Sequence, residues 1–414
     1  MSTLKRAVIT GIGAISCIGN NISEVTKSLK LGTSGIRFNE SYKELGMRSH
    51  ISGSINLNLK DLIDRKHLRF MGEAASYAYL STAEAIKDSG LDLSRFSSQD
   101  VGVIAGSGGA SSRSQVEAAD IVKSKGVKRI GPYRVTQTMG NTVSAALSTF
   151  FGIKGVNYSI SSACSTSAHC IGSALEQIQL GKQKIILAGG AEDEHWTMSS
   201  MFDAMGALSS SYNESPEKAS RPFDKDRDGF VIAGGAGMLV VEELDHALGR
   251  NADIYAEITG YGATADAFHL TSPAPNGTGA KEAMKIAIND AKINLNDIDY
   301  INAHGTSTFY NDLHETQAIK SLFKDHAYNL SISSTKSYVG HLLGATGGVE
   351  AIATIKSINN SYVTATINYK TKDPNCDLDY TPNNGFEKNI NHAISNNFGF
   401  GGHNASIVIS KFKD

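Results

Sequence analysis

The amino-acid sequence predicts an α/β fold in which the chain is built from two similar halves. Two observations support this prediction: strand and helix patterns alternate, and two short motifs recur in the same order. Residues 7–10 and 101–105 are apolar runs typical of buried strands, and residues 72–88 between them form an alanine-rich stretch typical of a helix. This alternation favours a sheet whose faces are covered by helices.

The recurring motifs divide the chain. Ile-Thr-Gly-Ile-Gly-Ala at 9–14 returns as Ile-Thr-Gly-Tyr-Gly-Ala at 258–263, and Ser-Ile-Ser-Ser at 159–162 returns at 331–334. Two halves of one topology, at residues 1–253 and 254–414, would explain both repeats. The motifs lie farther apart in the first half, so we expect insertions there that supply partner contacts and substrate walls.

The repeat also predicts where a site would lie. In this alignment Cys164 falls opposite Lys336, each just beyond a serine-rich strand. Because ligands of α/β sheets bind at strand ends, we expect both turns to approach one site.

Composition narrows the class of function. The chain has 41% hydrophobic residues, which is enough for a large core, and its 39 Lys and Arg against 41 Asp and Glu give a net charge of -2. This balance favours neither nucleic acid nor an anionic membrane as a partner. There is no apolar stretch long enough to span a membrane and no signal-peptide pattern, so we expect a cytoplasmic protein.

The four cysteines include one candidate nucleophile. No two of them form a Cys-x-x-Cys pair, which favours a reducing compartment over a disulfide framework. Residues 165–180 have helical apolar spacing and end at Gly181, so Cys164 is expected at a helix N-terminus. There the helix dipole would lower its pKa from about 8.5. A buried structural cysteine is the alternative, and it is the interpretation we adopt for Cys170.

Two histidines favour catalysis. His304 and His341 are each followed or preceded by glycine after a strand-like segment. Beside a cysteine they form a Cys-His-His set, and histidine can donate hydrogen bonds to a carbonyl oxygen that becomes anionic.

Three patterns that could indicate another ligand are set aside. The Gly-x-Gly at 11–13 lacks the third glycine of a dinucleotide fingerprint and is interpreted as a structural turn. Residues 224–229 imitate a calcium loop but have Gly235 where the bidentate glutamate belongs. The two histidines lack zinc-site spacing. We therefore expect no metal.

At this point the chain resembles the β-ketoacyl-acyl carrier protein synthases, and the type I elongating enzymes more than type II. The resemblance covers essentially the full length and is strongest at residues 159–181, 221–229, 304–308, 336–347 and 397–402. It implies the thiolase fold, in which duplicated βαβαβ-type halves form five αβαβα layers, and a homodimer. It also implies a condensing acyltransferase of fatty-acid synthesis that needs no cofactor, since phosphopantetheine arrives on the carrier.

The resemblance also implies roles for individual residues. Cys164 matches the acyl-accepting nucleophile, and the remaining catalytic group would be His304, His341, Lys336 paired with Glu350, Glu315, and Phe400, which is both a gate and a backbone oxyanion-hole donor. The substrate would contact Thr306, Thr308, Phe398 and Gly109, of which the threonines would bind the pantetheine arm and Gly109 would influence chain length.

One segment departs from the family. After Thr308 the family continues Pro-x-Gly-Asp, whereas this chain has Phe309, Tyr310 and Asn311 before Asp312. This departure bears on the conformation of the loop beside His304 and on the fit of the pantetheine arm, and the sequence leaves both open.

The implied partner is an acyl carrier protein bearing acyl or malonyl groups. Because carriers of this pathway are acidic, we expect basic docking clusters at Arg65, Lys66 and Arg69 and at Lys125, Lys128 and Arg129.

Alternative functions remain open. A ketosynthase of a polyketide or polyene pathway would share every catalytic residue. A non-catalytic chain-length partner subunit would normally lack the nucleophile that Cys164 provides. A biosynthetic thiolase would require a second active-site cysteine in the second half, and that half has only Cys376.

Overall fold

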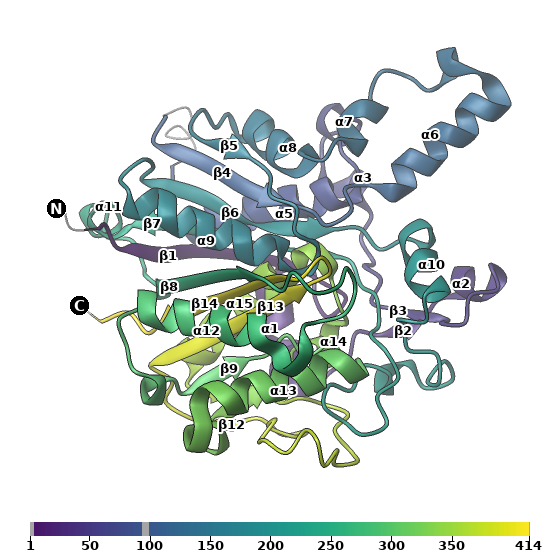
Figure 1. Ribbon diagram of the computed structural model, residues 1–414. Coiled ribbons are helices and arrows are strands. Elements are labelled where there is room, and N and C mark those ends of the chain that lie inside the picture. Colours follow the sequence, from purple (N-terminus) through teal and green to yellow (C-terminus); the bar gives the residue numbers. More distant parts are fainter. Residues whose placement is uncertain (1–3, 93–98, 414) are drawn as a thin grey trace.

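The computed structural model describes residues 4–92 and 99–413, and a ten-stranded sheet runs through it (Figure 1). The strand order is β10-β9-β13-β14-β8-β1-β7-β6-β4-β5. The first half contributes β1 (Ala7–Ile15), β4 (Val101–Gly106), β5 (Asn157–Tyr158), β6 (Ile185–Glu192) and β7 (Gly235–Glu243). The second half contributes β8 (Ala256–Ala265), β9 (Tyr300–Asn302), β10 (Ser331–Ser333), β13 (His392–Gly399) and β14 (His403–Ser410).

The two halves of this sheet have the same topology. In the first half, β1 pairs antiparallel with β7, β7 pairs antiparallel with β6, and β4 and β5 continue the sheet in parallel beyond β6. In the second half, β8, β14, β13, β9 and β10 pair in the same order and with the same directions. The halves meet where β1 pairs antiparallel with β8. The duplication expected from the repeated motifs is thus present in the backbone.

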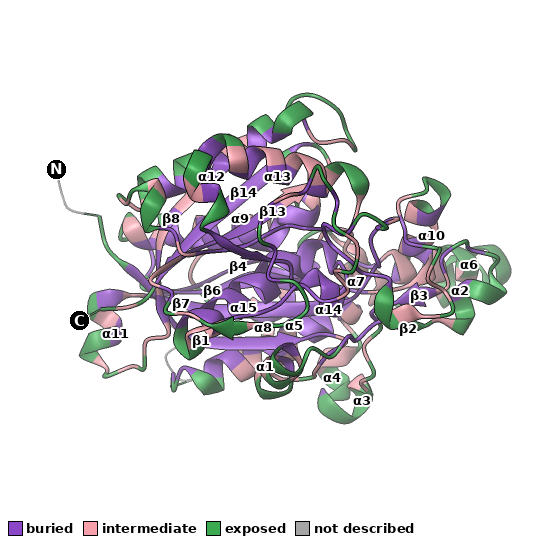
Figure 2. Ribbon diagram, turned by 90° about the horizontal axis from the view of Figure 1, so that it is seen from below, coloured by how far each residue is buried: buried purple, intermediate pink, exposed green. Residues whose placement is uncertain are grey.

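Helices complete five layers. The outer layers are α5 (Glu73–Asp88) with α8 (Thr142–Phe151) and α12 (Thr278–Asp290) with α13 (Phe309–Phe323). Between the two parts of the sheet lie α9 (Thr166–Gln179) and α15 (Thr346–Asn360), and each contacts strands of both halves. Figure 2 shows these strands and central helices as the buried interior. The predicted fold class is confirmed.

The repeated Gly-x-Gly lies within β1 and β8, so the turn predicted there is wrong, and the glycines have a packing role. A Cβ at Gly11 or Gly13 would lie 2.2 and 2.0 Å from carbonyl oxygens of α5, and one at Gly260 or Gly262 would lie 2.1 and 2.0 Å from carbonyl oxygens of α12. Glycine is therefore required for the first strand of each half to touch its covering helix.

The first half carries most of the additional elements, as the motif spacing predicts. They include α1 (Ile22–Leu31), α2 (Glu40–Glu44), α3 (Leu59–Leu62), α4 (Arg65–Leu68), α6 (Ser112–Lys125), α7 (Arg134–Thr138), α10 (Trp196–Ala204), α11 (Leu244–Gly249), and the strand pair β2 (Arg37–Phe38) and β3 (Ile51–Ser52). Helix α6 projects from the body of the molecule (Figure 1). Its side chains are mostly exposed.

One detail of the predicted alignment is wrong. Cys164 lies in the 3₁₀ turn Ala163–Ser165 that leads into α9, and the matching turn before α15 is Leu343–Ala345, so its counterpart is Gly344. Lys336 instead begins α14 (Lys336–Val339), a short helix inserted between β10 and that turn. The strands align as expected, but this insertion moves the turn before α15 farther along the chain. The predicted boundary at residues 253 and 254 falls between α11 and β8 and stays a prediction.

The second half also contains a small separate strand pair, β11 (Tyr362–Val363) and β12 (Phe386–Glu387), between α15 and β13. Within residues 4–92 and 99–413, no helix is both long and apolar enough to cross a membrane.

Candidate active site

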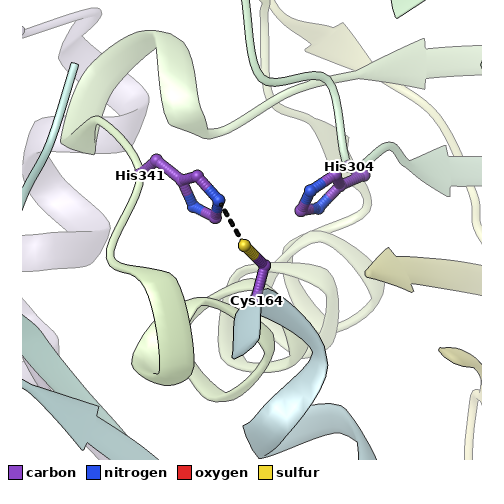
Figure 3. A group of neighbouring side chains, drawn as sticks. All are labelled: Cys164, His304 and His341. Carbon is purple, nitrogen blue, oxygen red and sulfur yellow. Dashed lines mark hydrogen bonds between the residues drawn. The ribbon is translucent and has the colours of Figure 1, made fainter. Parts of the chain in front are cut away.

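Cys164 sits on a tight turn between β5 and α9. Ala163, the residue before it, has a φ of 50°, a left-handed conformation that a small side chain tolerates best. The Ser162 N–H donates to the hydroxyl of Thr166 (2.9 Å), and the Ser165 hydroxyl donates to the Asn397 and His403 carbonyls of the second half (2.9 and 2.8 Å). The turn therefore presents the Cys164 thiol towards the second half (Figure 3).

The expected low pKa of this thiol is not found. Burial raises the pKa of Cys164 to about 11, outweighing the Lys336 charge and the hydrogen bonds from the Phe400 and Cys164 backbones, which lower it. Desolvation dominates because Cys164 is buried in an apolar cluster that includes Leu208, Phe230 and Leu343. The thiol is thus the favoured form, and it needs a base.

His341 is the adjacent base. Its Nε2 lies 3.0 Å from the Cys164 Sγ (Figure 3), and its Nδ1 lies 3.0 Å from the Thr346 hydroxyl at the start of α15. Burial, together with the Lys336 charge, holds the pKa of His341 well below its usual range. The imidazole is therefore neutral and able to accept a proton.

His304 faces the same sulfur from the other side (Figure 3), with its ring centroid 5.3 Å from that of His341. The Lys336 Nζ lies 3.2 Å from the His304 Nδ1 and 2.5 Å from its carbonyl oxygen. Since the ammonium donates to Nδ1, the ring proton belongs on Nε2, which points away from the lysine. Burial, Lys336 and His341 all lower the pKa of His304.

Two buried carboxylates support this arrangement. Glu350 lies 2.5 Å from Lys336 and accepts from the Asn397 amide at 2.7 Å. Glu315 accepts from the backbone N–H groups of His304 and Gly305, both at 2.8 Å. Burial raises the pKa of Glu315 to about 7. The structure thus brings together every residue expected to be catalytic, including Phe400, whose backbone hydrogen-bonds to the Cys164 thiol.

A cavity of about 510 Å³ opens onto Cys164 and both histidines. The expected substrate residues all line it: Gly109, Thr306, Thr308 and Phe398. The two threonine hydroxyls lie 2.8 Å apart, and the Phe398 ring lies edge-on to His304 at 5.7 Å. The space beside Gly109 is filled by Met198, because a Cβ there would lie 2.0 Å from the Met198 Cε.

The segment Phe309 to Asn311, whose sequence differs from the family pattern, forms the regular first turn of α13. Thr308 caps α13 by accepting from the Asn311 N–H (3.4 Å), and Asp312 accepts from the Thr306 N–H at 2.9 Å. Phe309 and Tyr310 occupy the first turn of α13, line the cavity and are more than half exposed. The segment therefore adds aromatic surface to the cavity without displacing Thr306 or Thr308.

The basic clusters lie on exposed parts of the first half. Arg65 and Lys66 are in α4 and Arg69 follows it, with its guanidinium 5.2 Å from the Phe70 ring and 5.1 Å from the Tyr133 ring. The second cluster, Lys125, Lys128 and Arg129, is at the end of α6 and in the following 3₁₀ turn Val127–Arg129.

The calcium-like segment has a structural use. Asp224 accepts from the Arg221 guanidinium and from the N–H groups of Lys370 and Thr371, and Asp228 accepts from the Ser209 hydroxyl. The ligand atoms of Cys164, His304 and His341 do lie within 4.8 Å of one another. The Lys336 ammonium in contact with His304 opposes a cation there.

Sequence reasoning missed Glu192, the last residue of β6. It is fully buried, and its carboxylate accepts from the N–H groups of Gly108, Gly109 and Gly344 around the cavity. The signal was available, because three consecutive acidic residues, Glu192, Asp193 and Glu194, directly follow a buried apolar strand. Acidic residues at the end of such a strand require a buried partner.

Comparisons with known proteins agree with this geometry. Residues 5–247 match the family model described as "Beta-ketoacyl synthase, N-terminal domain", and residues 255–370 match its "C-terminal domain". The chain is 51% identical to 3-oxoacyl-[acyl-carrier-protein] synthase 1 of Haemophilus influenzae and of Escherichia coli, in each case over 99% of this chain and 100% of the relative.

Solved structures are similar along the whole chain. A β-ketoacyl synthase from Burkholderia phymatum superposes with a TM-score of 0.93 at 34% identity, covering 99% of this chain and 100% of the other. A ketosynthase in the AntDE:AntF complex with its type II polyketide acyl-carrier protein gives a TM-score of 0.89 at 32% identity, with the same coverage. With both family models matched and full-length relatives at 51% identity, the chain belongs to the β-ketoacyl synthase family.

Proposed function

We propose that the protein is a β-ketoacyl-acyl carrier protein synthase that condenses malonyl carrier protein with an acyl group held on Cys164, elongating fatty acyl chains by two carbons. The observation that carries this proposal is one buried thiol in contact with neutral His341 and within 4.8 Å of neutral His304, all three lining a cavity of about 510 Å³. The full-length relatives at 51% identity, which bear the name 3-oxoacyl-[acyl-carrier-protein] synthase 1, support the substrate class.

The first half-reaction loads the acyl group. His341 Nε2, 3.0 Å from the sulfur, takes the thiol proton as the thiolate attacks the carrier thioester. The carbonyl oxygen becomes anionic and is stabilised by the backbone N–H groups of Cys164 and Phe400, which in the free protein face the sulfur. The carrier thiolate then departs and takes a proton from solvent.

The second half-reaction makes the carbon–carbon bond. The malonyl thioester carbonyl accepts hydrogen bonds from Nε2–H of His304 and of His341, and loss of carbon dioxide leaves an enolate that these donors stabilise. The enolate carbon attacks the acyl carbonyl, and the Cys164 thiolate leaves and takes back a proton from Nε2 of His341, which regenerates the resting thiol. Because the Thr346 hydroxyl can donate to or accept from Nδ1, His341 can serve in both half-reactions.

An acyl carrier protein is the proposed partner, docking on the exposed clusters at α4 and at the end of α6. A homodimer in the cytoplasm is proposed as well. The exposed edge strand β5, and the exposed apolar residues Val122, Val127 and Val135 around α6 and α7, support a second copy at this end of the sheet.

The alternatives differ in substrate or in the nucleophile. A polyketide ketosynthase would use the same site with another carrier. The relative named 3-oxoacyl-[acyl-carrier-protein] synthase 1 is 51% identical to this chain, against 32% for the ketosynthase of the polyketide complex. A chain-length partner subunit without catalysis is disfavoured because Cys164 contacts His341.

The test separates the nucleophile from decarboxylation. Cys164→Ala should abolish condensation but retain release of labelled carbon dioxide from malonyl carrier protein. His304→Ala and His341→Ala should each lower that release by about 10²- to 10³-fold, the usual effect of losing one oxyanion donor. If both histidine variants decarboxylate like the parent, the proposed roles are wrong.

A further inference from the structure

A buried carboxylate that takes no part in the proposed reaction lies behind the cavity wall. Glu192 is 0% exposed, and its partners are four hydrogen-bond donors. Oε1 accepts from the Ser107 hydroxyl (2.6 Å) and the Gly109 N–H (3.2 Å), and Oε2 accepts from the N–H groups of Gly108 (2.7 Å) and Gly344 (3.0 Å). Such a set of donors fits an ionised carboxylate, which only accepts.

These donors come from both halves of the molecule. Ser107, Gly108 and Gly109 follow β4 of the first half, and both glycines line the cavity. Gly344 belongs to the second half and lies three residues beyond His341, in the turn before α15. A Cβ at Gly108 or Gly344 would lie 2.7 or 2.9 Å from Oε2, so the carboxylate is tightly enclosed.

We propose that Glu192 is a positioning residue that fixes the cavity wall at Gly108 and Gly109 against the turn carrying His341. It thereby sets the place of the acyl chain relative to the histidine that contacts Cys164. This role rests on the proposed function, because it concerns the acyl chain and the condensation reaction. A displacement of about 1 Å at such a site can cost roughly 10²-fold in rate.

Glu192 also has an electrostatic effect that can be read at the sulfur without any substrate. Its negative charge raises the pKa of Cys164, whereas the Lys336 charge lowers it. The other groups facing the thiol are the neutral imidazoles of His341 and His304. Asp193, next to Glu192, has its pKa raised to about 8 by burial and by Glu192.

The main test is Glu192→Gln in the full-length protein. The amide NH₂ would face backbone N–H groups, so at least one hydrogen bond is lost. We expect kcat for condensation to fall about 10²-fold, with little change in KM for the carrier. Alkylation of Cys164 by iodoacetamide should meanwhile shift to lower pH, because the opposing charge is gone.

Glu192→Asp separates the two effects. Its charge remains but its shorter side chain cannot span both loops, so condensation should fall while the alkylation profile stays like that of the parent. A purely electrostatic role would predict normal condensation. Ser107→Ala, which removes one donor and perturbs the core less, should lower condensation by a smaller factor and serves if Glu192→Gln fails to fold.

The matched control is Glu242→Gln. Glu242 is also fully buried but is held by Arg250, His246 and Thr10, away from the cavity. The pH profile of Cys164 alkylation in Glu242→Gln should be that of the parent. Peptide mapping should show that Cys170 and Cys376 do not become reactive in any folded variant.

Normal condensation by Glu192→Gln, or an alkylation profile that does not move, would overturn the proposal. If the parent itself fails to condense, the proposed function fails. The alkylation profiles then still decide whether Glu192 acts on Cys164.

Discussion

Cys164 combines a helix N-terminus with deep burial, and the two act on its pKa in opposite directions. Burial prevails and raises the pKa to about 11. The reactive thiolate is therefore made when needed, by transfer to His341, rather than held ready. A neutral thiol in the resting enzyme also lowers the reactivity of Cys164 towards oxidants and small electrophiles.

Met198 limits the cavity beside Gly109. Met198→Ala should extend the longest acyl chain by at least one elongation round, because the side chain that occupies this space is removed. Gly109→Met alone would clash with Met198 and is expected to impair folding as well as elongation.

The double variant Met198→Ala with Gly109→Met refills the space from the opposite side and should return products to the parental length. Chromatography of the acyl products would measure this. Longer products from the double variant than from Met198→Ala alone would contradict the assignment.

Glu315 links stability to pH. The unfolded chain releases this proton near pH 4.5, whereas the folded protein holds it until about pH 7. The folded state therefore binds more protons in this window, so its stability falls as pH rises from about 4.5 to about 7.

Glu315→Gln should make that decline shallower. The variant should also melt a few degrees lower at acidic pH, since an amide replaces the acceptor of two backbone N–H groups. Melting temperature recorded across the pH range tests this. An unchanged slope would show that Glu315 does not titrate in this range. The remaining slope reports the other carboxyls whose pKa burial raises, Glu350 and Asp193 among them.

At the scale of elements, α4 is a short helix with exposed basic residues, and two candidates of this cluster differ: Lys66 within the helix and Arg69 just after it. Arg69 stacks on Phe70 and Tyr133, so its replacement perturbs packing, whereas Lys66 is the cleaner probe. Lys66→Glu should raise KM for the carrier several-fold at low salt and weaken its salt dependence, because rim charges act on association.

Lys30→Glu, at the exposed end of α1, is the control for charge reversal. Alkylation of Cys164 should be unaffected in both variants. Equal KM values for Lys66→Glu and the parent at every salt concentration would remove α4 from the docking surface.

Sequence reasoning was strongest where local pattern decides structure. The positions of Cys164 before a helix and of His304 after a strand both follow from spacing. It was weakest where distant segments meet. The raised pKa of Cys164, the role of Met198 and the four donors around Glu192 depend on contacts between segments that are far apart in the sequence, which no local pattern encodes.

At the scale of the whole molecule, the two halves share one sheet and one central helical layer. Helices α9 and α15 each pack on strands of both halves, and β1 pairs with β8. Residues 1–253 expressed alone should therefore aggregate or remain molten, because the apolar surface of α9 that packs on α15, β8 and β14 would be exposed to water.

Expressed together with residues 254–414, the same fragment should recover folded protein, as judged by a cooperative melting transition and Cys164 alkylation like that of the parent. A stable, cooperatively melting fragment on its own would instead show that residues 1–253 form an independent domain.

The glycine pairs of β1 and β8 have a consequence for the history of the chain. Any side chain there would collide with the carbonyl oxygens of α5 or α12, so neither copy could drift after an ancestral gene was doubled. Elsewhere the halves were free to diverge, one acquiring the nucleophile and the other the histidines. The two halves therefore still share glycine at these positions, where the strand backbone contacts the helix backbone.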